Sequence, residues 1–426
     1  MPIPKKKGQG KPAGSRIPGT YDFLPRDEDF VNAVNAARAA VAELHDYHLI
    51  EAPAAENESL AVKGYGKSPE GLLPWILKGA KPGEGVALGL PSEFGAIRAY
   101  CDEHLAHFAS PFKAHCASQT FAVSGPKAAL SESHEVAFHV IGDSDPIYDC
   151  QSIISAFDFV KIMKIKDAVL KVSTLGCRAC RSSFREKTKT YYSSRRGKLC
   201  ATCVKALEHS GPYVCEGQKP DCAAIHDEAP LILDSLCHSC NNHFKTVLEL
   251  LEDNGVAYEP DPRLARVAPY GNRTVFEIRS VSGRTLAVGG RYDYLAEMLF
   301  NRSVPAVGAT IRVPALLAAA REQKISYRDK RRPRVFFVAV GDQAKRASLR
   351  PINHLRTHGI PVVESLGKKS LKAQLKVAEK CEATLALIFG QREVFEGSII
   401  VRDLRSSAQE TVVLDRLAEE VKRRLK

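Results

Sequence analysis

Two nearby stretches organise this sequence: RVAPYGNRTVFE (Arg266–Glu277) and VGGRYDYLAEM (Val288–Met298). In the first, turn-forming residues lead into β-branched and aromatic residues, which predict a strand. In the second, the pair Gly289–Gly290 permits a close approach of the backbone, and a helical pattern begins at Tyr294. Together the stretches predict a strand, a glycine-rich segment and a helix around one site.

The composition is that of a soluble protein with two or three domains. At 426 residues, the chain is long enough for each domain to bury its own core. No apolar run approaches the ~18 residues of a membrane span, and no signal-peptide pattern opens the chain. We therefore expect a cytoplasmic protein without a membrane partner. The net charge of +12 favours nucleic acid as the partner, and a generally basic soluble protein is the alternative.

The first stretch resembles the histidine-binding signature of the histidyl-tRNA synthetases, class II enzymes that activate histidine with ATP. Arg266, Tyr270 and residues 272–277 match that signature. Its acidic position is Pro269 here, and its second tyrosine is Gly271. The resemblance thus keeps the frame of the signature and loses part of its chemistry.

The resemblance continues in unbroken order from Gly19 to the C-terminus. It implies an α/β (α+β) fold: a class II synthetase antiparallel sheet flanked by helices, a cysteine-rich inserted module, and a C-terminal mixed-sheet α/β domain of the anticodon-binding type. We expect a basic disordered tail (1–18), the first part of the class II core (19–172), the inserted module (173–262), the second part of the core (263–326) and the anticodon-binding-like domain (333–426). The lysines of the tail either touch phosphates or are merely solvated.

The first class II motif implies a dimer. Apolar residues recur at helical spacing from Phe30 to Leu44, and a strand is expected to end at Pro53. In the family, the proline-bearing strand of this motif lies at a dimer interface. The resemblance therefore implies a homodimer with Pro53 at the interface.

Val86–Arg98 matches the family stretch that holds the amino group of the bound amino acid. The family's arginine and its amino-binding glutamate are Gly89 and Pro91 in this chain. A cationic amino group needs a carboxylate acceptor. If the loop is extended, Glu93 lies roughly 7 Å beyond position 91, so we do not expect Glu93 to serve as a substitute.

The cations that would act on ATP are also replaced. The family's motif-two arginine, which binds the α-phosphate, is Ala122 here, and its motif-three arginine is Ala315. Arg312 stands in place of a glycine at the ATP contact, and its long side chain is expected to fill the nucleotide site. Because fixed guanidinium groups stabilise the charge that develops as adenylate forms, we expect that ATP is not a cofactor.

The pocket residues that survive are Arg266, Tyr270, Glu135 and His134. His134 keeps the family's identity, whereas Glu135 replaces a glutamine and His139 replaces a substrate-binding glutamate. The two histidines either perform new acid–base chemistry or, as is more common, are satisfied polar residues of the core.

Eight of the twelve cysteines lie in the inserted module. Without a secretion signal, such a cluster predicts metal ligands rather than disulfides. Two CxxC pairs with residues 181–199 between them can close a tetrahedral zinc site. We expect one or two structural zinc ions, grouped most simply in sequence order as the first four and the last four cysteines; reduced cysteines in a helical module are the alternative. The eight are Cys177, Cys180, Cys200, Cys203, Cys215, Cys222, Cys237 and Cys240.

Beyond a basic linker (324–334), strands alternate with helices, which predicts an α/β domain with a mixed sheet. The pattern resembles the anticodon-binding domain of the histidyl, prolyl, threonyl and glycyl synthetases. Cations at and along one helix suit phosphate contacts, and a solvated helix face is the alternative. They are Lys368, Lys369, Lys372 and Lys376, with Arg346 and Arg350 as a weaker pair on a helix expected over 345–358.

Substitutions therefore fall on catalytic positions while the scaffold is kept. The first hypothesis is an inactive histidyl-tRNA synthetase paralogue, a homodimer that binds tRNA or another RNA in a regulatory or translation-associated role, with a protein partner left open. The second is a remodelled class II enzyme acting on another amino acid or a nucleotide. A divergent but working histidine–tRNA ligase is the third. The anticodon domain and the insertion argue against a regulatory subunit like that of ATP phosphoribosyltransferase.

Overall fold

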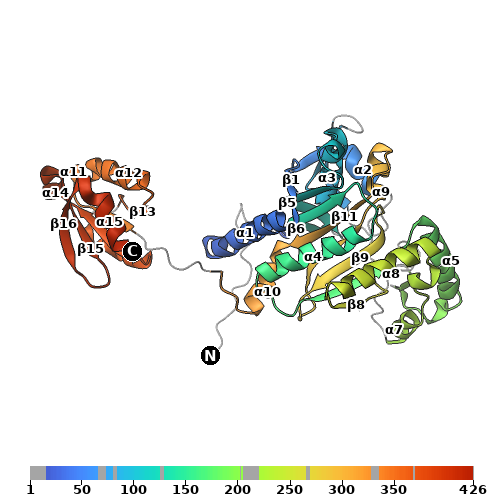
Figure 1. The fold of residues 1–426 in the computed structure, drawn as a ribbon. Coiled ribbons are helices and arrows are strands. Elements are labelled where there is room, and N and C mark those ends of the chain that lie inside the picture. The colour runs from blue at the N-terminus through green and yellow to red at the C-terminus, as the bar shows by residue number, and fades with distance from the viewer. Residues whose placement is uncertain are drawn as a thin grey trace, which may run out of the picture. The chain divides into compact units, whose positions relative to one another are not determined.

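The computed structural model describes residues 16–65, 73–79, 84–124, 129–201, 203–204, 220–264, 269–327, 335–367 and 370–425. The chain divides into two compact units, Met1–Tyr327 and Arg328–Lys426 (Figure 1). Within the described ranges, no helix is long and apolar enough to cross a membrane.

A single large sheet forms the centre of the first unit. Its strands are β1 (His48–Leu49), β2 (Ala55–Asn57), β3 (Leu73–Leu77), β4 (Val86–Leu88), β5 (Phe112–Ser124), β6 (Ala129–Ile141), β7 (Val169–Thr174), β8 (Tyr258–Pro260), β9 (Asn272–Arg279), β10 (Thr285–Arg291) and β11 (Ala306–Arg312). They run in the order β2-β4-β3-β5-β6-β11-β10-β9-β7-β8, and β1 pairs with β5. The central pairs, from β5 to β7, are all antiparallel, as the class II resemblance implies.

Helices cover both faces of this sheet. The helices of the unit are α1 (Glu28–His45), α2 (Glu58–Tyr65), α3 (Ser92–Asp102), α4 (Ile147–Ile162), α5 (Arg178–Ser193), α7 (Pro220–Asp227), α8 (His238–Asp253), α9 (Tyr294–Phe300) and α10 (Val313–Glu322). One core joins the sheet to α1, α4, α8 and α10, and a second joins it to α2, α3 and α9. The helix predicted from Phe30 to Leu44 is confirmed as part of α1.

The alternation of side chains along β11 decides which residues reach the candidate site. Val307, Ala309 and Ile311 are buried in the core that holds α1 and α4. Because successive strand residues point to opposite faces, Gly308 and Arg312 face the other side, where they line a cavity. In the β6–β11 register their partners are His139 and Glu135, so these two side chains project toward that side as well.

The second unit has a mixed sheet, as predicted. Its elements are β12 (Val335–Ala339), α11 (Asp342–Ala347), α12 (Leu349–Thr357), β13 (Val362–Glu364), α13 (Leu371–Lys380), β14 (Leu385–Phe389), α14 (Gln391–Glu396), β15 (Ser398–Asp403), β16 (Gln409–Val413) and α15 (Leu417–Leu425). The order is β13-β12-β14-β15-β16; β12 is parallel to β13 and β14, and the remaining pairs are antiparallel. Strand β16 and helix α14 were not predicted.

One predicted helix of this unit is wrong in its extent. The helix expected over 345–358 is two helices, because α11 ends at Ala347 and α12 begins at Leu349. Pro351 has no N–H to donate to the carbonyl of Ala347. The Ser348 hydroxyl instead donates back to the Lys345 carbonyl at 2.7 Å. The local sequence therefore favours a break where the apolar spacing suggested continuity.

Candidate functional site

A cavity of about 210 Å³ lies against the β9–β10–β11 part of the large sheet. Gly289 and Gly308 are part of its lining. A Cβ atom at Gly289 would lie 2.3 Å from the Phe276 ring, and one at Gly308 would lie 2.4 Å from Nδ1 of His139. At Gly290, the second residue of the predicted pair, a Cβ would lie 2.4 Å from the backbone carbonyl oxygen of Thr274, so the close approach of the pair is to the protein itself.

Glu93 and Tyr270 form the polar centre of this cavity. The Tyr270 hydroxyl donates to Oε1 of Glu93 at 2.8 Å. Burial raises the pKa of Glu93, and burial followed by the charge of Glu93 raises that of Tyr270. A carboxylate held in this way can accept a hydrogen bond from a cationic ligand.

The expectation that Glu93 lies too far away was wrong. It assumed an extended loop, but α3 begins at Ser92 with Pro91 as its N-cap. A helix rises only ~1.5 Å per residue, so the first turn brings Glu93 to the cavity. The sequence did carry a signal, because a proline followed by an acidic residue is typical of a helix start.

Glu135 lies opposite Arg312 across the β6–β11 pair. Burial, and then the charge of Glu93, raises the pKa of Glu135 to about 6, against a smaller opposing effect of Arg312. Arg312 lines the cavity. Ala315 packs against the hydrophobic core on α10 instead, so it presents no charged group to the cavity.

The raised pKa of Glu135 predicts a pH-dependent stability difference. The folded pKa of about 6 exceeds the unfolded value of ~4.3. The folded state is therefore favoured fully below the unfolded pKa, and this contribution is lost as pH rises through about 6. We expect Glu135→Gln to raise the free energy of unfolding by about 1–2 kcal/mol at pH 7.5. The gain should vanish near pH 4 in urea unfolding. An equal gain at both pH values would contradict the assignment.

The two histidines of β6 have the geometry of satisfied structural residues. His139 is buried, with Nε2 3.0 Å from Ser92 Oγ and Nδ1 2.9 Å from the Tyr292 hydroxyl. Burial lowers its pKa to about 4, which leaves the ring neutral near pH 7. His134 places Nε2 3.0 Å from Glu132. The contacts favour the core alternative over new acid–base chemistry.

Two further residues, Arg266 and Pro53, were predicted to take part in function. Arg266 falls outside the described residues. Pro53 is exposed and lines a separate cavity of about 120 Å³. Of the four surviving pocket candidates, the structure brings Tyr270 to the cavity and places Glu135 beside it, whereas His134 is held by its own neighbours.

The cysteines of the inserted module form two nested groups. The Sγ atoms of Cys177, Cys180, Cys237 and Cys240 all lie within 4.8 Å of one another. Those of a second group, Cys200, Cys203 and Cys222, meet the same limit. The sequential grouping was therefore wrong. Cys177 and Cys180 join Cys237 and Cys240, and the second group comes from the sequence between these two pairs. Cys215, the remaining candidate, falls outside the described residues.

The local chemistry of the first cysteine group is mixed, because burial raises the pKa of Cys180 and Cys240 whereas the pKa of Cys177 is lowered. Cys177 is the N-cap of α5, and Cys237 is the N-cap of α8. Burial raises the pKa of Cys177, but hydrogen bonds, chiefly from the backbone N–H of Cys180, outweigh that effect and lower it to about 7. Helix N-termini favour thiolates, the form that binds metal.

The candidate phosphate-binding residues do not form one surface. Lys372 and Lys376 are exposed on α13, one turn apart. Arg346 lies on α11 and Arg350 on α12, both exposed. Lys368 and Lys369 fall outside the described residues.

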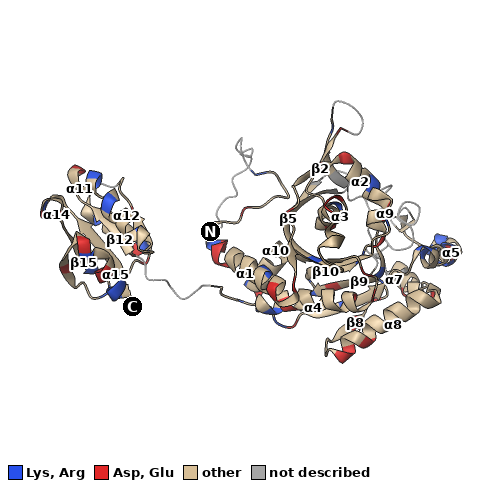
Figure 2. Cartoon of the chain, turned by 45° about the horizontal axis from the view of Figure 1, so that its top comes forward, with Lys and Arg blue, Asp and Glu red and all other residues tan. Residues whose placement is uncertain are grey.

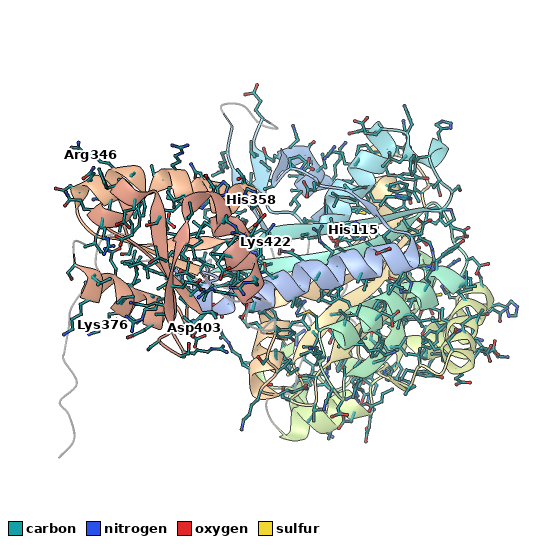
Figure 3. All side chains as sticks on the ribbon, turned by 60° about the vertical axis from the view of Figure 1, so that its left-hand side comes forward. His115, Arg346, His358, Lys376, Asp403 and Lys422 are labelled. Atoms are coloured by element: carbon teal, nitrogen blue, oxygen red, sulfur yellow. The ribbon has the colours of Figure 1, made fainter. Side chains whose placement is uncertain are left out.

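The two pairs lie on opposite faces of the small sheet. α11 and α12 pack on the face that holds Val335 and Phe337, whereas α13 packs on the face that holds Phe336. Figure 3 labels Arg346 and Lys376 on opposite sides of this unit. Lys and Arg residues also lie along helix α5 of the inserted module (Figure 2).

Comparisons with known proteins agree with this architecture. Residues 334–424 match the family model of the anticodon binding domain. The histidine–tRNA ligase of Dehalococcoides mccartyi is 30% identical over 413 residues, which cover 96% of this chain and 99% of that protein.

Solved structures show the same fold. The apo histidyl-tRNA synthetase of S. aureus has a TM-score of 0.75 and 23% identity, and the match covers 96% of this chain and 100% of that one. The histidyl-tRNA synthetase of Nostoc sp. has a TM-score of 0.63 and 20% identity over 97% of this chain and 100% of that one.

Proposed function

This chain belongs to the histidine–tRNA ligase family, and from that premise we propose that it binds tRNA or another RNA without aminoacylating it. The observation that carries the proposal is the remodelled cavity. By the family resemblance, Ala122 and Ala315 stand at the positions of the two ATP-binding arginines, and Arg312 lines the cavity. Removing one group that stabilises developing negative charge costs about 3–4 kcal/mol of transition-state stabilisation, so the loss of both leaves adenylation negligible.

The RNA-binding half of the proposal rests on the C-terminal unit. It matches the anticodon binding domain over residues 334–424, and α13 presents Lys372 and Lys376 to solvent. Among the described residues, neither lysine forms an ion pair with an acidic side chain. Free cations one helical turn apart suit consecutive phosphates. The role is regulatory or translation-associated, in the cytoplasm.

We expect the double substitution Lys372→Glu, Lys376→Glu to weaken tRNA binding about tenfold or more near 0.1 M salt, and to reduce the salt dependence of the affinity. Each lysine releases counterions from the RNA when it binds a phosphate, whereas a glutamate at the same position repels that phosphate. Filter retention of labelled tRNA measures the effect. Arg346→Glu with Arg350→Glu makes the same charge change at the weaker candidate pair on the other face of the sheet, and its effect should be smaller. Equal losses in both variants would contradict the assignment to α13.

Zinc is the metal that we propose for the cysteine groups. Tetrahedral Zn–S bonds of ~2.3 Å place the sulfur atoms ~3.8 Å apart. The spacing in the first group, with Cys177 and Cys180 Sγ atoms 3.6 Å apart and all four within 4.8 Å, fits that geometry. Thiolates are soft ligands that favour zinc over magnesium or calcium. With four protein ligands, such an ion has no open position, so its role is structural.

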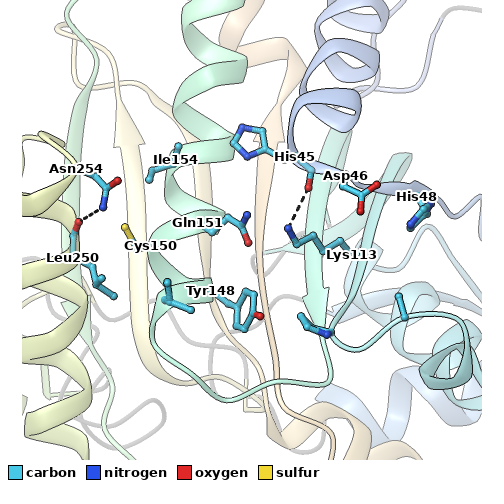
Figure 4. A pocket seen from close by; sticks show the side chains of 13 residues that line it. His45, Asp46, His48, Lys113, Tyr148, Cys150, Gln151, Ile154, Leu250 and Asn254 are labelled. Atoms are coloured by element: carbon cyan, nitrogen blue, oxygen red, sulfur yellow. Dashed lines mark hydrogen bonds between the residues drawn. The ribbon is translucent and has the colours of Figure 1, made fainter.

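A homodimer is the proposed assembly. A cavity of about 630 Å³ lies between the end of α1, β5, α4 and α8 (Figure 4). Ile147, which is 50% exposed, lines it, and Leu49 and Phe108, 54% and 68% exposed, are close to lining residues in sequence. A second copy across this face would cover these apolar side chains. The resemblance that implies the dimer also assigns Pro53, which is exposed, to the interface.

A remodelled class II enzyme is the second candidate. It is favoured by the buried Glu93–Tyr270 pair and the nearby Glu135, which suit a small ligand that carries an amino group. Saturable binding of an amino acid in calorimetry, lost in Glu93→Gln, would support this alternative. Binding without turnover would remain consistent with an inactive paralogue.

A further inference from the structure

The nested cysteine groups place one centre at the neck of the inserted module. Cys177 and Cys180 follow directly after β7, where the chain leaves the large sheet, and Cys237 and Cys240 open α8, which leads back to it. We call these four residues the neck centre, and Cys200, Cys203 and Cys222 the inner group. Of the two groups, the neck centre is the one whose described residues come from both ends of the module.

The neck centre is bonded to the wall of the cavity through the backbone. Leu175, two residues before Cys177, lines the cavity. Its N–H donates to the Arg273 carbonyl at 2.6 Å, and the Arg273 N–H donates to the Gly176 carbonyl at 2.9 Å. Arg273 stands at the start of β9, two residues after Gly271 of the lining. A shift of the neck centre would therefore move this edge of the cavity.

A second connection runs through α5 to α9. Arg178, next to Cys177, donates to both carboxylate oxygens of Glu297 at 3.0 and 2.9 Å. Its guanidinium carbon lies 4.2 Å from the ring centre of Tyr294. Arg178 and Glu297 are 57% and 45% exposed, so this pair alone would hold the helices weakly. The Arg178–Glu297 pair can hold α9 in place only if another interaction fixes the start of α5.

A third connection runs through α8. His243 lies three residues after Cys240 and is buried. Its Nε2 is 3.3 Å from Oδ1 of Asp149 and 3.4 Å from Oγ1 of Thr274, a residue that lines the cavity. One turn of α8 thus carries both Cys240, a candidate metal ligand, and His243, which contacts the cavity residue Thr274.

We propose that a metal ion bound by Cys177, Cys180, Cys237 and Cys240 is a positioning element for the cavity, so that the geometry of the ligand pocket depends on metal in a module outside it. Without the ion, the start of α8 is held to the sulfur atoms of α5 by a hydrogen bond from the Cys237 N–H to Cys180 Sγ at 3.1 Å, a much weaker link than four metal–thiolate bonds. With the ion, β9 and α9 are fixed through the three connections. The inner group stabilises the module itself and has no such contact among the described residues. The inference rests on metal binding and not on the proposed RNA function.

The test compares two cysteine variants of the full chain, Cys237→Ser with Cys240→Ser in the neck centre and Cys200→Ser with Cys203→Ser in the inner group. Metal content is measured on each protein, and amide hydrogen exchange is followed in peptides over residues 272–279 and 294–300. We expect the neck variant to lose one metal equivalent and to exchange about tenfold faster in both peptides, because local opening becomes easier. The inner variant should keep the wild-type rates there. Equal rates in all three proteins, or equal acceleration in both variants, would overturn the proposal.

Two further measurements keep the test informative if the neck variant does not fold. Wild-type protein stripped with a chelator should show the same acceleration over residues 272–279, and added Zn²⁺ should reverse it. Arg178→Ala should keep its metal content and accelerate exchange over 294–300 alone. Unchanged exchange in metal-stripped wild-type protein would overturn the proposal, and unchanged exchange in Arg178→Ala would remove the connection through α5. None of these outcomes depends on ATP or tRNA.

Discussion

Asp149→Ala should lower the free energy of unfolding of the first unit by about 3–5 kcal/mol. Asp149 on α4 and Arg291 on β10 have fully buried side chains, with Arg291 Nη2 2.6 Å from Oδ2 of Asp149. Arg291 also donates to the carbonyls of Asp143 and Asp145 at 3.1 and 2.7 Å. Truncating the carboxylate leaves the buried guanidinium with the more distant carboxylate of Asp293, 3.5 Å away, and this loss costs far more than the loss of an exposed pair.

The exposed pair Arg284–Glu322 supplies the matched control. Its N–O distance is 2.7 Å, close to that of the buried pair, but both side chains are more than 40% exposed. Glu322→Ala should therefore cost far less stability than Asp149→Ala. Urea unfolding followed by fluorescence reports on the first unit, because the single tryptophan is Trp75 of β3. Similar losses in the two variants would contradict the role assigned to Asp149.

Removal of metal should unfold the inserted module. In zinc-finger peptides, the binding free energy of a structural zinc ion amounts to about 10–16 kcal/mol and appears as folding free energy. The module has two cysteine groups and a long helix, α5, whose described buried residues are few: Cys180, Phe184, Thr188 and Tyr192. We expect that complete chelation abolishes hydrogen-exchange protection throughout α5.

Circular dichroism and hydrogen exchange measure this effect on the full chain. Helical signal should fall on chelation and return with Zn²⁺ but not with Mg²⁺, because thiolates are soft ligands. Protection in β12 and β14 of the second unit serves as the internal control and should not change. If the amides of α5 stayed fully protected from hydrogen exchange in protein shown to be metal-free, the proposal that a metal ion stabilises the module would be contradicted.

The sequence predicted the scaffold well because its signals are local. Helical spacing from Phe30 to Leu44 and the strand after Asn272 depend only on neighbouring residues, and both elements are present. The mixed sheet of the C-terminal unit followed from the alternation of strands and helices. The edges of elements were less predictable: the Ser348 break depends on a proline three residues later.

The site was less predictable because it depends on which distant residues meet. Cysteine spacing gives the ligand type but not the pairing, and the structure nests the groups that sequence order had placed side by side. Glu93 was discounted on the assumption of an extended loop, whereas the helix start at Ser92 brings it to Tyr270. Likewise, Arg346 and Lys376 are both exposed cations, but only the packing of the sheet places them on opposite faces.

The measurement that tests the central proposal most directly is histidine-dependent ATP–pyrophosphate exchange on purified, zinc-replete protein, with tRNA retention measured on the same sample. We predict no exchange above background, because Ala122 and Ala315 take the places of the family's two arginines. We also predict retention of tRNA, with an affinity that charge reversal on α13 weakens about tenfold or more. Exchange above background that saturates with histidine would contradict the proposal, and it would mean that other residues of the cavity replace both arginines.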